Sequence, residues 1–247
     1  MNDELKSYGG LRCRIFDNLP AGSAPQKLVV LCHGFGAPGD DLAQFGPELI
    51  RSSDAVQETC RFVFPEAPID LGDHGIPGGR AWWPINMAAL ARINETRSFE
   101  ELTTMEPPGM AEATDQLLQA IREAQDDSGV SNARTTLGGF SQGAMVTTNL
   151  VLDKGFNPEL LVLFSGTLLN SQHWSAQADA HPSCSVLQSH GTLDMVLPFE
   201  PAESLRDMLV SAGFDVRFHS FAGPHTIPME MLLELQQSLA AAPSNGE

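Results

Sequence analysis

The sequence predicts an α/β protein with a mainly parallel central sheet and helices on both faces. Short apolar runs, such as residues 27–32 and 160–164, alternate along the chain with segments of helical periodicity. These runs are continuously apolar, as expected of parallel strands that are covered on both faces. In addition, a Gly-Phe-Ser-Gln-Gly sequence at residues 139–143 lies between an apolar run and a helical pattern, which is typical of a sharp strand-to-helix turn.

The composition is that of a folded protein, and we expect a single domain over residues 1–247. Of these residues 42% are hydrophobic and 18% charged, and a chain of this length can bury a sizeable core. The net charge of −17 disfavours binding to nucleic acid and to anionic lipid surfaces, because both are negatively charged. With no apolar run long enough to span a bilayer and no visible secretory signal, we expect no stable membrane insertion and a cytoplasmic location.

The four cysteines are expected to be buried, reduced thiols. Cys13, Cys32, Cys60 and Cys184 are widely separated, without the C-x-x-C spacing of a metal or redox site. Two of them lie within apolar, strand-like runs, where a thiol behaves as a small apolar side chain. We therefore expect neither disulfides nor a bound metal.

The first third of the chain provides three expected strands and one helix. Residues 11–16 alternate between apolar and polar side chains, which is typical of a half-buried edge strand. Residues 27–32 and 61–65 are apolar enough to be buried strands. Residues 42–50 are expected to form a helix, with the two aspartates before it as candidate caps.

The middle of the chain begins with a loop and continues with helices. Residues 70–80 contain four glycines and are expected to form a loop. Residues 87–102 have a weak helical pattern and form an insertion. Residues 110–121 place apolar side chains at the i, i+3, i+4 and i+7 positions of a helix face. The strand that leads to the Gly-Phe-Ser-Gln-Gly sequence is expected to begin near residue 134.

The last third repeats the alternation of strands and helices. The expected strands are residues 160–164, 185–188 and 214–221, and the expected helices follow residue 143 and cover residues 201–211 and 228–240. Reactive groups in a parallel sheet collect at the carboxyl ends of the strands, so the loops that follow these strands are the places to search for a catalytic site.

Ser141, at the centre of the turn, is the candidate nucleophile, and it needs a general base. In α/β-hydrolases the triad follows the order serine, acid, histidine, which excludes His33 and His74 among the seven histidines. Of the others, His173 and His181 fall in an expected polar loop, His190 ends a strand and His219 lies within one. His225 follows the last strand and precedes the last helix, which favours it as the base.

Asp194 is the candidate orienting acid, because it follows a late strand and precedes the histidine. Asp179, Asp207 and Asp215 are less well placed, in a polar loop, in a helix and at the start of a strand. A carboxylate at this position in the chain order would fix the tautomer of His225 and stabilise the imidazolium that forms during attack.

Two backbone N–H groups are expected to stabilise the oxyanion. One belongs to Gln142, which follows the nucleophile, and the other to the loop after residues 27–32, where Phe35 is the candidate. His33, in the same loop, is expected to be a hydrogen-bonded structural histidine.

Four segments together resemble the phospholipase/carboxylesterase family, which includes acyl-protein thioesterases and small bacterial carboxylesterases. They are residues 31–36, 137–144, 190–194 and 223–225, in the order of that family. The resemblance implies an α/β-hydrolase fold. It also implies Ser141 as nucleophile, Asp194 as orienting acid and His225 as base, with Phe35 and Gln142 as oxyanion donors.

The sequence departs from this family after residue 80. Arg-Ala-Trp-Trp-Pro at residues 80–84 resembles the family's Arg-Ala-Trp-Phe-Asp, and an extra stretch at residues 85–108 follows it. We name residues 80–108 the cover segment, because the resemblance puts them near the active site. Trp82 and Trp83 are candidate substrate-binding residues, of which at most one ring is expected to pack inward. A filled acyl pocket would favour short chains.

The sequence thus predicts a serine carboxylesterase for neutral esters of short to medium acyl chains, without a metal or organic cofactor. Its expected partner is a small-molecule ester, and the oligomeric state is left open, with a homodimer among the alternatives. A thioesterase or lysophospholipase would use the same groups and differ only in its pocket. A catalytically silent binding module on the same fold is the alternative from another class.

Overall fold

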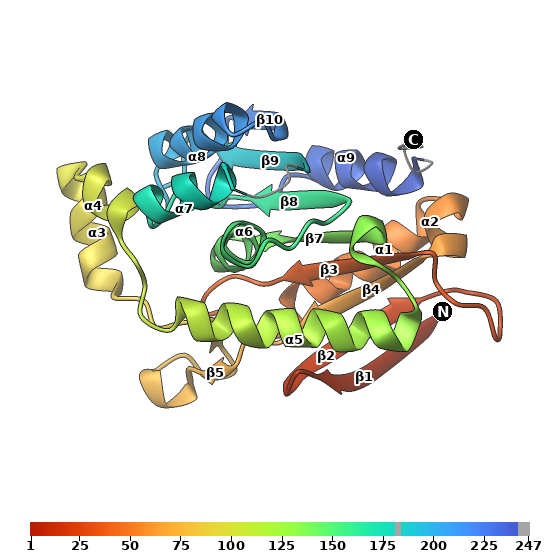
Figure 1. Ribbon diagram of the computed structural model, residues 1–247. Helices are drawn as coiled ribbons and strands as arrows, with labels where there is room; N and C mark the ends of the chain where they lie inside the picture. Colours follow the sequence, from red (N-terminus) through yellow and green to blue (C-terminus); the bar gives the residue numbers. More distant parts are fainter. Residues whose placement is uncertain (181–183, 242–247) are drawn as a thin grey trace.

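The computed structural model describes residues 1–180 and 184–241. Within these residues an eight-stranded sheet has the order β1-β2-β4-β3-β7-β8-β9-β10 (Figure 1). Its strands are β1 (Asn2–Tyr8), β2 (Leu11–Asp17), β3 (Lys27–Cys32), β4 (Cys60–Pro65), β7 (Thr135–Phe140), β8 (Leu160–Phe164), β9 (Ser185–Gly191) and β10 (Asp215–Phe221). A separate antiparallel pair is formed by β5 (Ile69–Asp70) and β6 (Arg80–Ala81). The strands from β4 to β10 along this order are parallel, as the sequence predicts.

Strand β1 is the edge of the sheet, and the prediction of β2 as the edge strand is wrong. β2 pairs antiparallel with both β1 and β4. Gly9 and Gly10 connect β1 to β2, and their φ angles of 56° and 76° are those of a tight hairpin turn that side chains disfavour. Lys6 and Tyr8 of β1 both donate to the carboxylate of Asp127, at 2.8 and 2.7 Å, which fastens the polar edge strand to the helix beside it.

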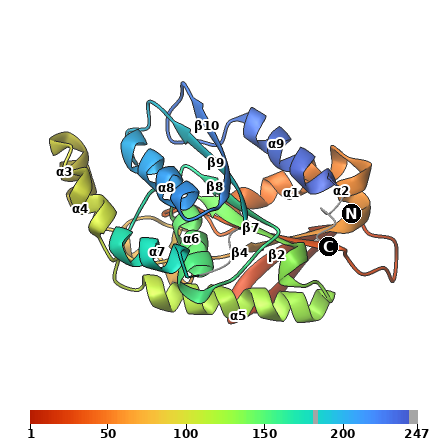
Figure 2. The ribbon, with the colours of Figure 1, turned by 45° about the horizontal axis from the view of Figure 1, so that its top comes forward.

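Helices cover both faces of the sheet, and each face has its own apolar cluster. The α-helices are α1 (Phe45–Arg51), α2 (Asp54–Thr59), α3 (Met87–Thr96), α4 (Phe99–Thr104), α5 (Met110–Ser128), α6 (Gln142–Lys154), α7 (Ser171–Ala178), α8 (Phe199–Ser211) and α9 (Met229–Ala240). Helices α5 to α8 pack with the larger cluster, and α1, α2 and α9 pack with the smaller one. Figure 2 shows α1 and α9 on the opposite side of the sheet from α5.

Several helices differ from the sequence prediction. The expected helix at residues 42–50 begins as a 3₁₀ turn (Asp41–Gln44), and Asp40 makes no capping hydrogen bond through its side chain. Helices α2 and α7 were not predicted, and His173 lies in α7 instead of a loop. The expected helix over residues 87–102 is two helices, because Arg97 ends α3 in the left-handed region with φ of 54°.

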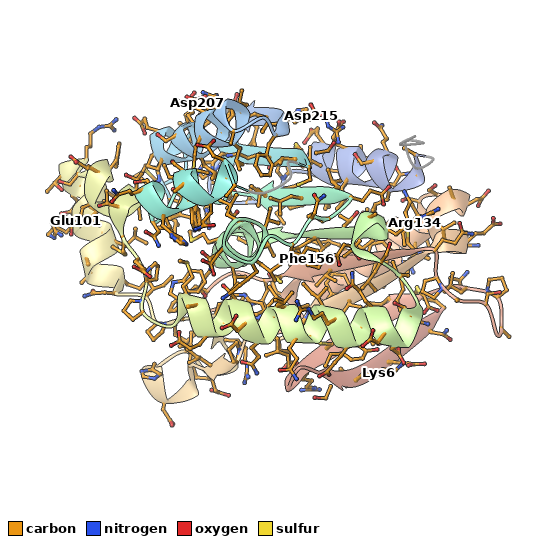
Figure 3. All side chains as sticks on the ribbon, viewed as in Figure 1. Lys6, Glu101, Arg134, Phe156, Asp207 and Asp215 are labelled. Atoms are coloured by element: carbon orange, nitrogen blue, oxygen red, sulfur yellow. The ribbon has the colours of Figure 1, made fainter. Side chains whose placement is uncertain are left out.

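Helices α3 and α4 project beyond the carboxyl ends of the strands, where they pack on each other and α4 lies beside α8 (Figure 1). Charged side chains such as Glu101 of α4 and Asp207 of α8 point outward, whereas Phe156 is buried (Figure 3). All four cysteines are free thiols; Cys13, Cys32 and Cys60 are buried, as the sequence predicts, but Cys184 is partly exposed, so the prediction of burial is wrong there. No helix among the described residues is both long and apolar enough to span a bilayer.

Candidate active site

Ser141 lies at the turn between β7 and α6, and its backbone is strained. Its φ of 55° and ψ of −118° fall outside the regions that a serine normally occupies. Glycines make the turn possible. A Cβ built on Gly143 would lie 2.0 Å from the carbonyl oxygen of Cys32, and one built on Gly139 would lie 2.4 Å from the same oxygen. The sharp turn predicted from the sequence is therefore present, and only glycine fits on either side of it.

His225 and Asp194 come together from two loops at the carboxyl edge of the sheet. His225 follows β10 and Asp194 follows β9, and the imidazole Nδ1–H donates to Asp194 Oδ2 at 2.6 Å. The other carboxylate oxygen, Oδ1, accepts from the backbone N–H groups of Val196 and Leu197 at 2.8 and 2.9 Å. Burial acts to raise the pKa of Asp194. The hydrogen bonds from His190, from His225 and from the backbone outweigh it and hold that pKa well below its usual range.

His190 is a further histidine at the candidate acid, and the sequence reasoning considered it only as a rival base. Its side chain is fully buried, with Nε2 at 2.8 Å from the carbonyl oxygen of Leu197 and 3.3 Å from Asp194 Oδ2. Because a carbonyl oxygen can only accept, Nε2 carries the hydrogen. The signal that could have revealed it is its position four residues before Asp194, at the end of a strand.

A cavity of about 240 Å³ joins the remaining predicted groups. Ser141, His225, Phe35 and Gln142 all line it, so the candidate nucleophile, base and oxyanion donors face one space. The ring of Phe140 lies beside the imidazole of His225, with 4.7 Å between their centroids. Among these described residues no hydrogen bond joins the Ser141 hydroxyl to His225, a contact that often tightens only when substrate binds.

His33 is structural, as the sequence predicts. It is 1% exposed, its Nε2 accepts from the Ala67 N–H at 3.0 Å, and its Nδ1–H donates to the Gly34 carbonyl at 2.8 Å. These two partners require one neutral tautomer. Burial lowers the pKa of His33 to about 4. The imidazole thus stays uncharged and holds the loop that carries Phe35.

Both tryptophans are buried, so the prediction that at most one ring packs inward is wrong. Trp82 is 1% exposed and Trp83 is 2% exposed. The two residues form a bend after β6, and the side chain of Gln142 holds their backbone. Its Oε1 accepts from the Trp82 N–H and its Nε2 donates to the Trp83 carbonyl, both at 2.9 Å. The two rings nevertheless differ, since Trp83 lines a cavity and Trp82 does not.

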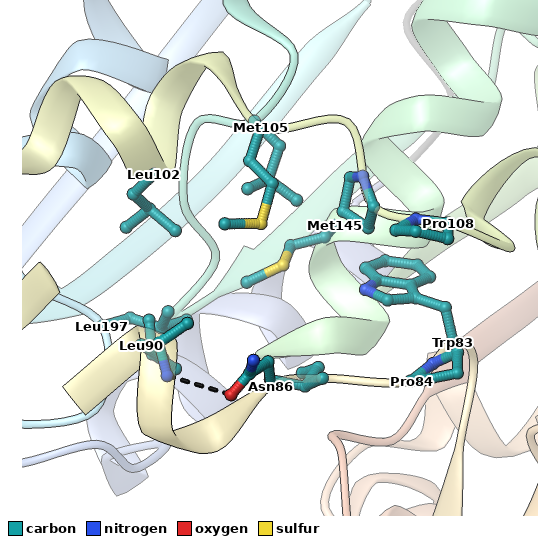
Figure 4. Close-up of a pocket in the computed structure, with 13 residues that line it drawn as sticks. Trp83, Pro84, Asn86, Leu90, Leu102, Met105, Pro108, Met145 and Leu197 are labelled. Atoms are coloured by element: carbon teal, nitrogen blue, oxygen red, sulfur yellow. Dashed lines mark hydrogen bonds between the residues drawn. The ribbon is translucent and has the colours of Figure 1, made fainter. Parts of the chain in front are cut away.

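The cavity beside Trp83 has a volume of about 400 Å³ and lies under α3 and α4. Trp83 and Pro108 lie on one side and Leu90 and Leu102 on the other, with Met145 between them (Figure 4). Its lining is apolar except for Asn86 and the indole N–H of Trp83, and the Asn86 oxygen accepts from the N–H of Ala89 at the start of α3. Four residues line both this cavity and the one at Ser141: Ile85, Leu90, Met145 and Leu197. The two cavities therefore adjoin.

Curated proteins of similar sequence are acyl-protein thioesterases. Acyl-protein thioesterase 1 of Eremothecium gossypii is 29% identical over 196 residues, which cover 78% of this chain and 77% of that protein. The corresponding protein of Debaryomyces hansenii is 25% identical over 212 residues, covering 83% of this chain and 84% of its own.

Solved structures are similar as well. The crystal structure of esterase PE8 matches with a TM-score of 0.74 and 27% identity, over 91% of this chain and 95% of that one. A carboxylesterase from Mesorhizobium loti matches with a TM-score of 0.72 and 18% identity, over 98% and 100% of the two chains. The fold is that of the α/β-hydrolases. Because the model of the phospholipase/carboxylesterase family matches residues 19–242, the chain belongs to that family of hydrolases.

Proposed function

We propose that this protein is a serine carboxylesterase in which Ser141 is the nucleophile, His225 the base and Asp194 the orienting acid. The observation that carries the proposal is the 2.6 Å hydrogen bond from His225 to Asp194, at the edge of the cavity that the strained Ser141 lines. Membership in the family supports hydrolase chemistry. A catalytically silent module would have no need for a strained serine beside a histidine–carboxylate pair.

The geometry supports a two-step reaction. His225 Nε2 takes the proton of the Ser141 hydroxyl as its oxygen attacks the ester carbonyl, and the backbone N–H groups of Phe35 and Gln142 receive the oxyanion. Collapse of this intermediate expels the alcohol, which takes the proton from His225 and leaves an acyl-enzyme. Water then attacks the acyl-enzyme through the same base, and the carboxylic acid departs. Asp194 stabilises the imidazolium in both steps.

The apolar cavity under the cover segment supports an acyl chain of medium length. The sequence predicted a filled pocket that favours short chains, but α3 and α4 roof an open volume instead of filling it. If each methylene takes about 30 Å³, close to the share of a water molecule in the liquid, then 400 Å³ accommodates about thirteen carbons. No charged side chain lines the cavity, and the Asn86 oxygen already accepts from Ala89, so the cavity is suited to an uncharged chain.

The test is a serine-directed fluorophosphonate together with p-nitrophenyl esters from acetate to palmitate. We expect one labelled site in the wild type and none in Ser141→Ala, with kcat lowered by about 10³-fold or more and an unchanged melting temperature. Ser23→Ala is the matched control, because Ser23 is exposed in the loop at the amino end of β3, whereas the candidate site lies at the carboxyl ends of the strands. Retention of label and most activity in Ser141→Ala would refute the nucleophile.

Thioester hydrolysis is the second candidate, since the curated relatives described above are acyl-protein thioesterases. An acyl thioester and an oxygen ester present the same carbonyl to Ser141 and the same chain to the apolar cavity. Matched octanoyl esters and octanoyl thioesters distinguish the two activities. We expect the larger kcat/KM for the oxygen ester, and a clear excess for the thioester would favour the second candidate.

A further inference from the structure

We propose that Asn94, on helix α3 of the cover segment, is a positioning residue for the carboxylate of Asp194. The proposal rests on the proposed function, in which Asp194 orients the catalytic base. The cover segment would then help to orient the acid of the triad, in addition to lying over the apolar cavity.

The side-chain amide of Asn94 reaches the loop that holds the carboxylate. Its Nδ2 donates to the carbonyl oxygens of Met195 and Val196, at 3.1 and 3.0 Å. Each of these carbonyls belongs to a peptide group whose N–H points the other way. The peptide after Met195 carries the N–H of Val196, and the peptide after Val196 carries the N–H of Leu197. Those are the two N–H groups that donate to Asp194 Oδ1, at 2.8 and 2.9 Å.

Two hydrogen-bonded relays therefore run in parallel from Asn94 to Asp194 Oδ1, each through one peptide group. A donor on a carbonyl oxygen polarises its peptide and strengthens the hydrogen bond that the N–H of the same peptide makes. With Oδ1 fixed in this way, the plane of the carboxylate is fixed as well. Its other oxygen, Oδ2, then faces His225 at 2.6 Å.

The orientation of the Asn94 amide follows from its partners. Two carbonyl oxygens can only accept, so the nitrogen and not the oxygen of the amide must face them, and both of its hydrogens are used. The amide oxygen is buried without a partner, so this side chain is not placed to satisfy its own polar atoms. The contact satisfies two carbonyl groups of the Asp194 loop and leaves one polar atom of Asn94 itself unpaired.

The backbone of α3 is held independently of this contact. Ile93, next to Asn94, is fully buried in the main apolar cluster. Arg97, one turn further on, forms an ion pair with Glu200 of α8. This ion pair is exposed, and among the described residues neither partner makes a hydrogen bond to the Asp194 loop. Arg97→Gln thus loosens the same helix without breaking either relay, and is the matched control.

The experiment compares Asn94→Ala with Arg97→Gln on p-nitrophenyl acetate, whose acyl group is too short to enter the apolar cavity. We expect Asn94→Ala to lower kcat by about tenfold with little change in KM, because the loss of the relays weakens the transition state and not binding. Arg97→Gln is expected to keep kcat within about twofold. Asn94→Asp, which keeps the shape but has no hydrogen to donate, should be at least as damaging as Asn94→Ala.

A double-mutant cycle with Asp194→Asn decides whether Asn94 acts through the carboxylate. In the Asp194→Asn protein no carboxylate remains to be held, so Asn94→Ala should then change kcat by less than about twofold. Urea unfolding of each variant identifies any loss of folding. The inference is overturned if both folded Asn94 variants keep the wild-type kcat on p-nitrophenyl acetate. It is also overturned if Asn94→Ala lowers kcat as much in the Asp194→Asn protein as in the wild type. Wild-type activity in Asp194→Asn alone would instead refute the proposed function.

Discussion

The indole Nε1–H of Trp82 donates a hydrogen bond of 3.0 Å to the main-chain carbonyl of His33. His33 in turn accepts from Ala67 and holds Gly34, so the ring of Trp82 is part of the support beneath the oxyanion loop. Trp83, its neighbour, has the apolar cavity beside it. Two adjacent and equally buried tryptophans therefore have different surroundings, and different consequences follow when each is changed.

Replacement of each tryptophan by phenylalanine should separate these roles. Trp83→Phe enlarges the apolar cavity, so the ester of highest kcat/KM should shift toward longer chains. Trp82→Phe removes the donor to the His33 carbonyl and should lower the free energy of unfolding by about 1–3 kcal/mol without such a shift. Kinetics with butyrate, octanoate and palmitate esters, together with urea unfolding, test both. Identical chain-length profiles in the two variants would contradict the assignment of Trp83 to the acyl cavity.

Gln142 should be important for stability as well as for its backbone N–H. Gln142→Met keeps the size of the side chain but leaves the Trp82 N–H and the Trp83 carbonyl without partners. Each unpaired buried group costs about 1–3 kcal/mol, so we expect a loss of several kcal/mol in urea unfolding. Gln44→Met is the control, since the bond from Gln44 to the Asp41 carbonyl is exposed and should change stability by less than about 0.5 kcal/mol. Equal stability of the two variants would show that the hydrogen bonds of the Gln142 side chain to the Trp82 N–H and the Trp83 carbonyl are dispensable.

His33 should make the fold sensitive to mild acid. Its pKa of about 4 in the folded state lies below the ordinary 6.5, so between these pH values the unfolded chain binds the extra proton. Stability from this group is therefore complete above pH 6.5 and declines as the pH falls toward 4, by about 3 kcal/mol in total. His33→Gln keeps an acceptor for Ala67 and should flatten this part of the profile. Parallel profiles for the wild type and the variant, from urea unfolding between pH 4 and 7, would exclude His33 as the source.

The sequence was most informative where one physical demand acts on a few neighbouring residues. The continuous apolar run of β3 and the glycines around Ser141 follow from burial and from close approach of the backbone, and both are local signals. β1 was missed because its side chains are mostly polar and exposed, and it is a strand only through its hydrogen bonds to β2. The composition of a strand does not predict it when the strand is stabilised mainly by hydrogen bonds to its partner.

The parts of the site that could not be predicted depend on contacts between distant segments. The two buried tryptophans lie in a bend whose backbone is held by Gln142, about 60 positions later, through one donor and one acceptor. Asn94 reaches the loop after Asp194 across about 100 positions. No spacing or motif in the sequence identifies either pairing, because an asparagine or glutamine amide can form hydrogen bonds with any backbone group that it reaches.

The hydrogen bonds of Asn94 to the carbonyls of Met195 and Val196 have a consequence for protein engineering. Residues 85–108, which the sequence resemblance predicts to be an extra stretch, lie between β6 and α5 and would be the natural segment to exchange. A chimaera that replaces them with a shorter loop would open the apolar cavity and at the same time release the turn that follows Asp194. Grafts designed to broaden substrate range should therefore carry a donor for those two carbonyls, or be paired with a redesigned turn.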